Sequence, residues 1–129
     1  MLSKEQILSA NDIESKVVSV PEWGGEVMVV GLNATEKDEF ENGLVTRDEK
    51  TGKAKANLKG ATARLCALCI KDENGERLFA DSEIVALGEK SGKAIKRVYD
   101  VAEDLSGLKP GEVEEIVKNS EKTQVADSD

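Results

Sequence analysis

Apolar residues follow a strand-like pattern in residues 17–32. This stretch holds the densest run of β-branched residues and the only Trp, and Gly24-Gly25 lies in its middle, where a tight reversal favours residues that tolerate positive φ. Val18 and Val20 share one face of the first predicted strand. The pattern predicts a β-hairpin. Because a lone hairpin is marginally stable in water, helices further along the chain must cover one of its faces.

The first strand is followed by Pro21, which cannot donate a hydrogen bond to a neighbouring strand. We therefore expect Pro21 at a strand end or at the edge of the sheet. The predicted hairpin has at least one edge that could accept another strand.

Helical spacing of apolar residues, with capping signals, dominates the rest of the chain. The predicted helices span residues 3–9, 35–44, 54–70, 82–87, 91–106 and 111–118. Ser3 and Gln6 form a capping box for the first helix, and Thr35 is the expected N-cap of the second. The helix at 54–70 is the most apolar, and its second half is expected at the centre of the core.

Three segments carry weaker predictions. Residues 46–55 have no apolar side chain larger than Ala and are expected to form a mobile loop. Leu78-Phe79 is expected to fasten the preceding turn to the core. The short helix 111–118 has only a narrow apolar stripe. We expect this helix to be either loosely docked or ordered by a partner.

Together these elements predict an α+β fold, with an N-terminal β-hairpin packed on a mostly α-helical domain. The 129 residues suit one domain, which we assign to residues 1–118. Residues 119–129 are polar and acidic, and we expect them to form a disordered tail.

Composition excludes several classes of partner. A net charge of −8 argues against general nucleic-acid binding, which needs a basic surface. No run of 18 apolar residues or signal segment occurs, so we expect no membrane partner and a cytoplasmic location. Residues 47–71 nevertheless carry seven basic and two acidic side chains. This segment is either an ordinary solvated surface or a docking site for an acidic partner.

Catalytic chemistry has little support. The chain has no His, which removes the usual general base and any Ser-His-Asp or Cys-His arrangement. Cys66 and Cys69 have the spacing of half a zinc site or a redox pair, but they lie late in an apolar helix and no other Cys is present. Buried core cysteines are the favoured interpretation. We expect no catalytic residue, no metal and no cofactor.

Four stretches together resemble the tail assembly chaperones of long-tailed bacteriophages and prophages, and the resemblance extends over residues 7–120. The stretches are Val20-Pro-Glu-Trp-Gly-Gly-Glu-Val-Met-Val, the strand-to-helix passage 32–44, Ala63-Arg-Leu-Cys-Ala-Leu-Cys-Ile-Lys-Asp-Glu-Asn-Gly-Glu-Arg-Leu-Phe, and Leu87-Gly-Glu-Lys-Ser-Gly-Lys-Ala-Ile. The closing Lys118-Asn-Ser is similar as well. Their order and spacing carry the resemblance, since none of them is diagnostic alone.

The resemblance implies a non-enzymatic protein of the host bacterial cytoplasm that is absent from the mature virion. Such proteins bind the long, helical tape measure protein, keep it soluble and help to recruit subunits of the tail tube. Two other classes stay open: a virion structural or head-tail connector protein of the same gene region, and an acidic inhibitor that mimics DNA. Interspersed Lys and Arg count against the mimic.

A chaperone for amphipathic helices needs apolar surface that a client can cover. The candidate contact residues come from the hairpin and two helices: Trp23, Met28, Phe40, Leu44, Val113, Ile116 and Val117. Core packing is the competing role for each of them. For Trp23 we favour a role in closing the hairpin onto the helix that contains Leu65 and Leu68.

Overall fold

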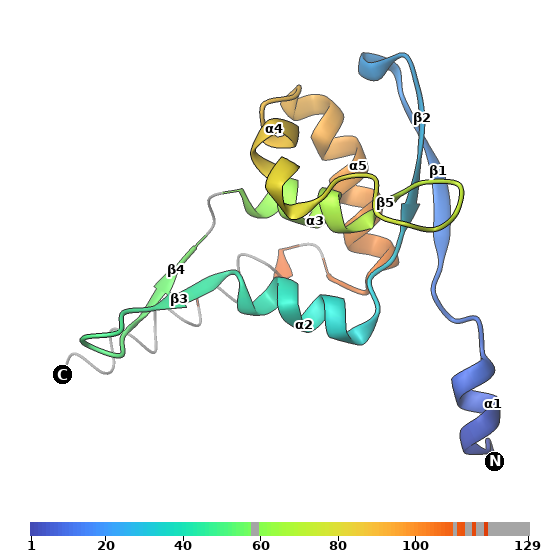
Figure 1. Cartoon of the computed structure of the whole chain (residues 1–129), viewed down its shortest axis with the longest axis horizontal. Helices are drawn as coiled ribbons and strands as arrows, with labels where there is room; N and C mark the ends of the chain where they lie inside the picture. The colour runs from blue at the N-terminus through green and yellow to red at the C-terminus, as the bar shows by residue number, and fades with distance from the viewer. Residues whose placement is uncertain (58–59, 110, 113–114, 116–117, 119–129) are drawn as a thin grey trace.

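A three-stranded antiparallel sheet organises the computed structural model, which describes residues 1–57, 60–109, 111–112, 115 and 118. Strands β1 (Ser15–Val20) and β2 (Gly25–Val30) form the predicted hairpin, and β5 (Ile70–Lys71) pairs with the other edge of β2. The hairpin turns through a 3-10 turn, η1 (Pro21–Trp23), and Gly24, whose φ of 74° is a left-handed conformation that Gly adopts without strain. The edge strands are β1 and β5; Arg77 and Leu78 meet the outer side of β5, so β1 is the open edge among the described residues (Figure 1).

Helices α3 (Ala61–Cys69) and α5 (Gly92–Leu105) form the core with the inner face of this sheet (Figure 1). Helix α5 contacts β1, β2 and α3, and its apolar face follows the predicted spacing. The most deeply buried side chains come from both layers: Val20, Val29, Leu44, Leu65, Cys66, Cys69, Ile70 and Val98. The α+β class is confirmed, and the second half of the predicted 54–70 helix does lie at the centre of the core.

Helix α2 (Ala34–Asn42) follows β2 and begins two residues earlier than its predicted cap implies. Asn33, not Thr35, is the N-cap: its side chain accepts a hydrogen bond from the Glu36 amide at 2.8 Å, and the Glu36 carboxylate accepts one from the Asn33 amide at 3.0 Å. This reciprocal pair satisfies two amides that the first turn leaves open, whereas Thr35 lies inside the helix. Lys37 and Glu41, one turn apart on this helix, form an ion pair at 3.3 Å.

The segment predicted as a mobile loop at 46–55 is instead largely a β-hairpin. Strands β3 (Val45–Arg47) and β4 (Ala54–Ala56) pair antiparallel and project from the body beyond α2 (Figure 1). Their connection is fixed locally, because the Asp48 carboxylate accepts hydrogen bonds from the amides of Lys50 and Thr51. Backbone pairing and this turn order the segment with little apolar burial.

The predicted 54–70 helix is correspondingly shorter. Its first residues form β4, Gly60 (φ 74°) precedes α3, and Ile70 has already left the helix to pair with Val29 of β2. A run of apolar residues fits a buried helix and a buried strand equally well, so periodicity alone does not mark this boundary.

Three smaller elements complete the described chain. Helix α1 (Lys4–Ser9) has the predicted capping box of Ser3 and Gln6 and lies away from the body (Figure 1). A 3-10 turn, η2 (Asp81–Glu83), leads into the short α4 (Ile84–Gly88). The predicted stripe Val113, Ile116 and Val117, and the predicted tail at 119–129, lie outside the described residues.

Candidate protein-binding surface

An apolar hollow lies on the outer side of the sheet, where β2 meets β5 and the turn that follows it. We call it the outer-face hollow; it has a volume of about 430 Å³ and is lined by Glu26, Val27, Met28, Ile70, Lys71, Asp72, Glu73, Asn74 and Leu78. Met28 is 36% exposed and Leu78 is 53% exposed. Side chains of this size left open beside a hollow provide surface that a partner can cover. Met28 was among the sequence-predicted contacts, and Leu78 was not.

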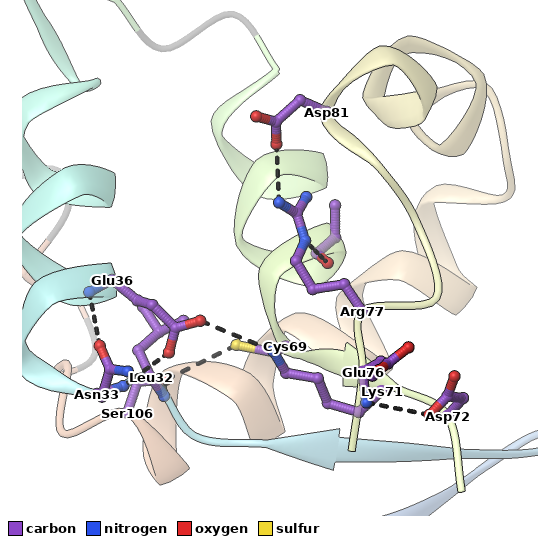
Figure 2. Close-up of polar contacts among 11 residues, drawn as sticks. Leu32, Asn33, Glu36, Cys69, Lys71, Asp72, Glu76, Arg77, Asp81 and Ser106 are labelled. Carbon is purple, nitrogen blue, oxygen red and sulfur yellow. Dashed lines mark hydrogen bonds and ion pairs between the residues drawn. The ribbon is translucent and has the colours of Figure 1, made fainter. Parts of the chain in front are cut away.

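The acidic turn beside this hollow is held in place by its own backbone. One oxygen of the Asp72 carboxylate accepts hydrogen bonds from two amides of the turn. The Asn74 amide donates at 2.8 Å, and the Glu76 amide, shown in Figure 2, donates at 3.0 Å. Lys71 is paired with Glu36 of α2 at 3.7 Å. The turn therefore presents Glu73 next to an apolar floor in a defined position.

The prediction that Leu78-Phe79 fastens this turn to the core is confirmed for Phe79 and wrong for Leu78. Its amide donates to the Ile70 carbonyl at 3.1 Å, while its side chain is exposed and the neighbouring Phe79 packs on the core. The turn is also fastened by Arg77, which donates to the Ala67 carbonyl at 3.3 Å and pairs with Asp81 at 2.9 Å (Figure 2).

A second hollow, of about 420 Å³, lies between α2, β3, α3 and α4. Its apolar lining includes Phe40, which is itself nearly fully buried, and its polar wall includes Arg64. The Arg64 guanidinium donates to the carbonyls of Gly43 at 3.1 Å and Asn57 at 3.4 Å, so it closes the end of α2. Leu44 is fully buried and presents no surface to a partner in this structure.

Trp23 lies in the hairpin turn, half-buried against the core. The turn packs on α5, and Arg97 of that helix donates to both oxygens of Glu22 at 3.0 and 3.1 Å. This hydrogen bond holds the pKa of the Glu22 carboxyl below its ordinary value. The turn thus closes the hairpin onto α5 as well as onto the shared core.

Cys66 and Cys69 are fully buried, as predicted. Burial raises the pKa of the Cys66 thiol to about 12 and that of Cys69 to about 11, so both are protonated at neutral pH. Cys69 contacts the Ser106 hydroxyl at 3.8 Å, and that hydroxyl accepts a hydrogen bond from the Leu32 amide at 3.0 Å (Figure 2). The two thiols join α3 to α5 and have the surroundings of inert core cysteines.

Neither a metal site nor a membrane-spanning helix is found among the described residues. Among the described residues, no three His, Cys, Asp or Glu side chains are grouped so that they could hold a metal ion. Within the same residues, no helix has the length and apolar character needed to cross a lipid bilayer.

The basic segment 47–71 does not form one continuous patch. Arg64 and Lys71 make the internal contacts described above, and Arg47 donates to the Gly52 carbonyl at 3.2 Å. Among the described residues of the segment, the exposed Lys50, Lys53 and Lys55 lie on the β3–β4 hairpin, and Lys59 lies outside the described residues.

The N-terminal arm was not recognised as a candidate surface from the sequence. Every residue from 1 to 17 is exposed, and α1 buries none of its side chains. Ile7 is 56% exposed and Leu8 is 77% exposed. Two adjacent apolar residues in a short helix predict burial, and only the structure shows that none of the described residues covers them.

The family of the chain is decided by comparison with protein-family models. The model described as phage tail assembly chaperone matches residues 3–124, nearly the whole chain. The chain belongs to the phage tail assembly chaperone family. No curated protein and no solved structure gives a significant match to it. The resemblance seen in the sequence is thereby confirmed, and a tail assembly chaperone implies partners among the phage tail proteins.

Proposed function

We propose that this tail assembly chaperone binds the tape measure protein, keeps it soluble during tail assembly and helps to recruit tail tube subunits. It acts without catalysis in the host cytoplasm and is absent from the finished virion. Membership of the family supports this proposal, as does the apolar surface that the chain leaves open. Helical clients are recognised by grooves that cover their apolar face.

The outer-face hollow is the site we propose for the client. Met28 and Leu78 offer apolar contact, and the carboxylates of Glu26 and Glu73 lie at the same hollow. A client helix with apolar residues on one face and Lys or Arg beside them complements this combination. Trp23 and Phe40 are secondary candidates, because both are already packed largely into the core.

Co-expression with the tape measure protein of the same phage tests this function. We expect the soluble fraction of the tape measure protein to rise and the two proteins to co-purify. A tape measure protein that is equally soluble alone would contradict the proposal. Detection of the chain in purified, complete particles would instead favour a virion structural or connector protein.

A further inference from the structure

We propose that two copies of this chain associate through the free edge of β1, forming one continuous six-stranded sheet with a two-fold axis at Val17. This interface shares Met28 with the outer-face hollow, but its test needs no client. Two independent features support it: open backbone groups and a self-complementary sequence.

The backbone of β1 is half unpaired. The amide of Gly31 donates to the Glu14 carbonyl at 2.9 Å, which continues the register in which Lys16 faces Val29 and Val18 faces Val27. In an antiparallel pair, hydrogen-bonded positions alternate with positions whose backbone groups point the other way. The N–H and C=O groups of Ser15, Val17 and Ser19 therefore point away from β2. Among the described residues no partner is seen for them.

Ser15, Val17 and Ser19 give the same order of residue types in both directions along the strand. In an antiparallel pair centred on Val17, Val17 faces Val17 of the second copy and Ser15 faces its Ser19. Open backbone groups then meet open backbone groups at all three positions. On the outer face, Met28 lies directly opposite Val17 within each copy, so the pairing joins the apolar Met28 and Val17 of both copies into one strip.

The charges next to the strand can be accommodated in the same arrangement. Extending this register places Asp12 opposite Glu22 in the hairpin turn of the second copy, and Glu14 opposite its Val20. Two cations of α5, Lys93 and Arg97, adjoin that turn and lower the pKa of Glu22. These cations offset the like charge of the Asp12–Glu22 pair, so the charges permit the pairing and do not by themselves select it.

The N-terminal arm can enlarge the contact. A six-residue helix is not stable in isolation, and α1 has a capping box but buries none of its side chains against the described residues. Residues 1–17 and Ser19 are exposed, whereas Val18 and Val20 face the core, so at most 18 residues of the arm and β1 are open to a second copy. This is slightly fewer than the roughly 20–30 residues that each partner contributes to a standard interface, so the arm must be part of the proposed contact.

Sedimentation equilibrium of the full chain tests the proposal. We expect the unmodified protein to dimerise with increasing concentration. Val17→Pro removes an amide that faces the open edge and none that faces β2, so it should weaken dimerisation by at least about tenfold. Val17→Lys should do the same, because it sets two like charges opposite each other across the two-fold axis.

Val85→Lys is the matched control, since Val85 is a strongly exposed apolar residue on α4, away from the sheet. We expect it to dimerise like the unmodified protein. Amide exchange gives a second readout: in the dimer the amides of Ser15, Val17 and Ser19 should be protected. In Val17→Lys the amides at these three positions should exchange rapidly, while those of Lys16 and Val18 stay protected.

Two results would overturn the proposal. One is a chain that stays monomeric at every concentration up to about 1 mM. The other is a dimer whose dissociation constant and amide protection are unchanged by both substitutions at Val17, which would place the interface elsewhere.

Discussion

Gly31 is the position where the packing of the sheet on α5 can be tested most sharply. It follows β2 directly and lies against the backbone at the end of α5: a Cβ added there would come within 2.9 Å of the carbonyl carbon of Leu105 and closer still to its carbonyl oxygen. Carbon atoms in ordinary contact are about 3.5–4.0 Å apart. Because the obstacle is backbone, Gly31→Ala must push the strand and the helix apart.

We expect Gly31→Ala to lower the free energy of unfolding by about 1–3 kcal/mol, the usual cost of overpacking. For a domain of this size, that corresponds to a melting temperature lower by roughly 3–15 °C. Thermal and urea unfolding followed by circular dichroism would measure both quantities.

Gly25→Ala is the matched control, because Gly25 begins the same strand and a Cβ there would meet no atom within 4 Å. We expect its stability to change by less than about 0.5 kcal/mol. If Gly31→Ala proves as stable as Gly25→Ala, the close contact between β2 and α5 is not a feature of the folded protein.

Three further predictions concern buried polar contacts, capping and pH. Ser106→Ala should lower stability by about 1–3 kcal/mol in urea unfolding, because the buried Leu32 amide loses its acceptor; an unchanged midpoint would contradict the contact. Asn33→Ala should cost about 1 kcal/mol by the same assay, and Thr35→Ala less than about 0.5 kcal/mol, since Asn33 is the cap. Because burial raises the pKa of Cys66 from 9.0 to about 12, the unfolded chain releases this proton first, and stability should fall as the pH rises above about 9. The difference between the urea midpoints at about pH 8 and about pH 10 should be smaller in Cys66→Ala than in the unmodified protein. The same difference in both proteins would argue against the buried thiol.

The parts of the fold that were predictable are those in which one face of an element meets the core. The hairpin alternates between buried Val18 and Val20 and exposed Val17, and α5 repeats apolar residues at helical spacing. The β3–β4 hairpin escaped prediction because it is ordered by backbone pairing and by the Asp48 turn with little apolar burial. The short β5 was not predicted, because it continues an apolar run and its pairing with β2 is a tertiary contact that the run does not reveal.

The candidate site was predictable to a similar degree. Alternation along β2 places Met28 and the buried Val29 on opposite faces of the sheet, so the exposure of Met28 follows from the pattern. Leu78 and α1 were missed because apolar residues near a turn or in a capped helix normally indicate burial. Leu44 looked like the continuation of a helical stripe, whereas α2 ends at Asn42 and Leu44 enters the core.

The central claim is tested most directly by measuring the affinity of the purified chaperone for the tape measure protein, before and after charged residues are introduced at the outer-face hollow. Met28→Asp and Leu78→Asp each place a charge on a part-exposed side chain at the hollow, and Val85→Asp places one on an exposed side chain of α4. We predict that the double variant at the hollow binds at least about tenfold more weakly, while Val85→Asp binds like the unmodified protein and all variants keep their melting temperatures. Equal affinity of the double variant and the control would contradict the assignment of this surface to the client.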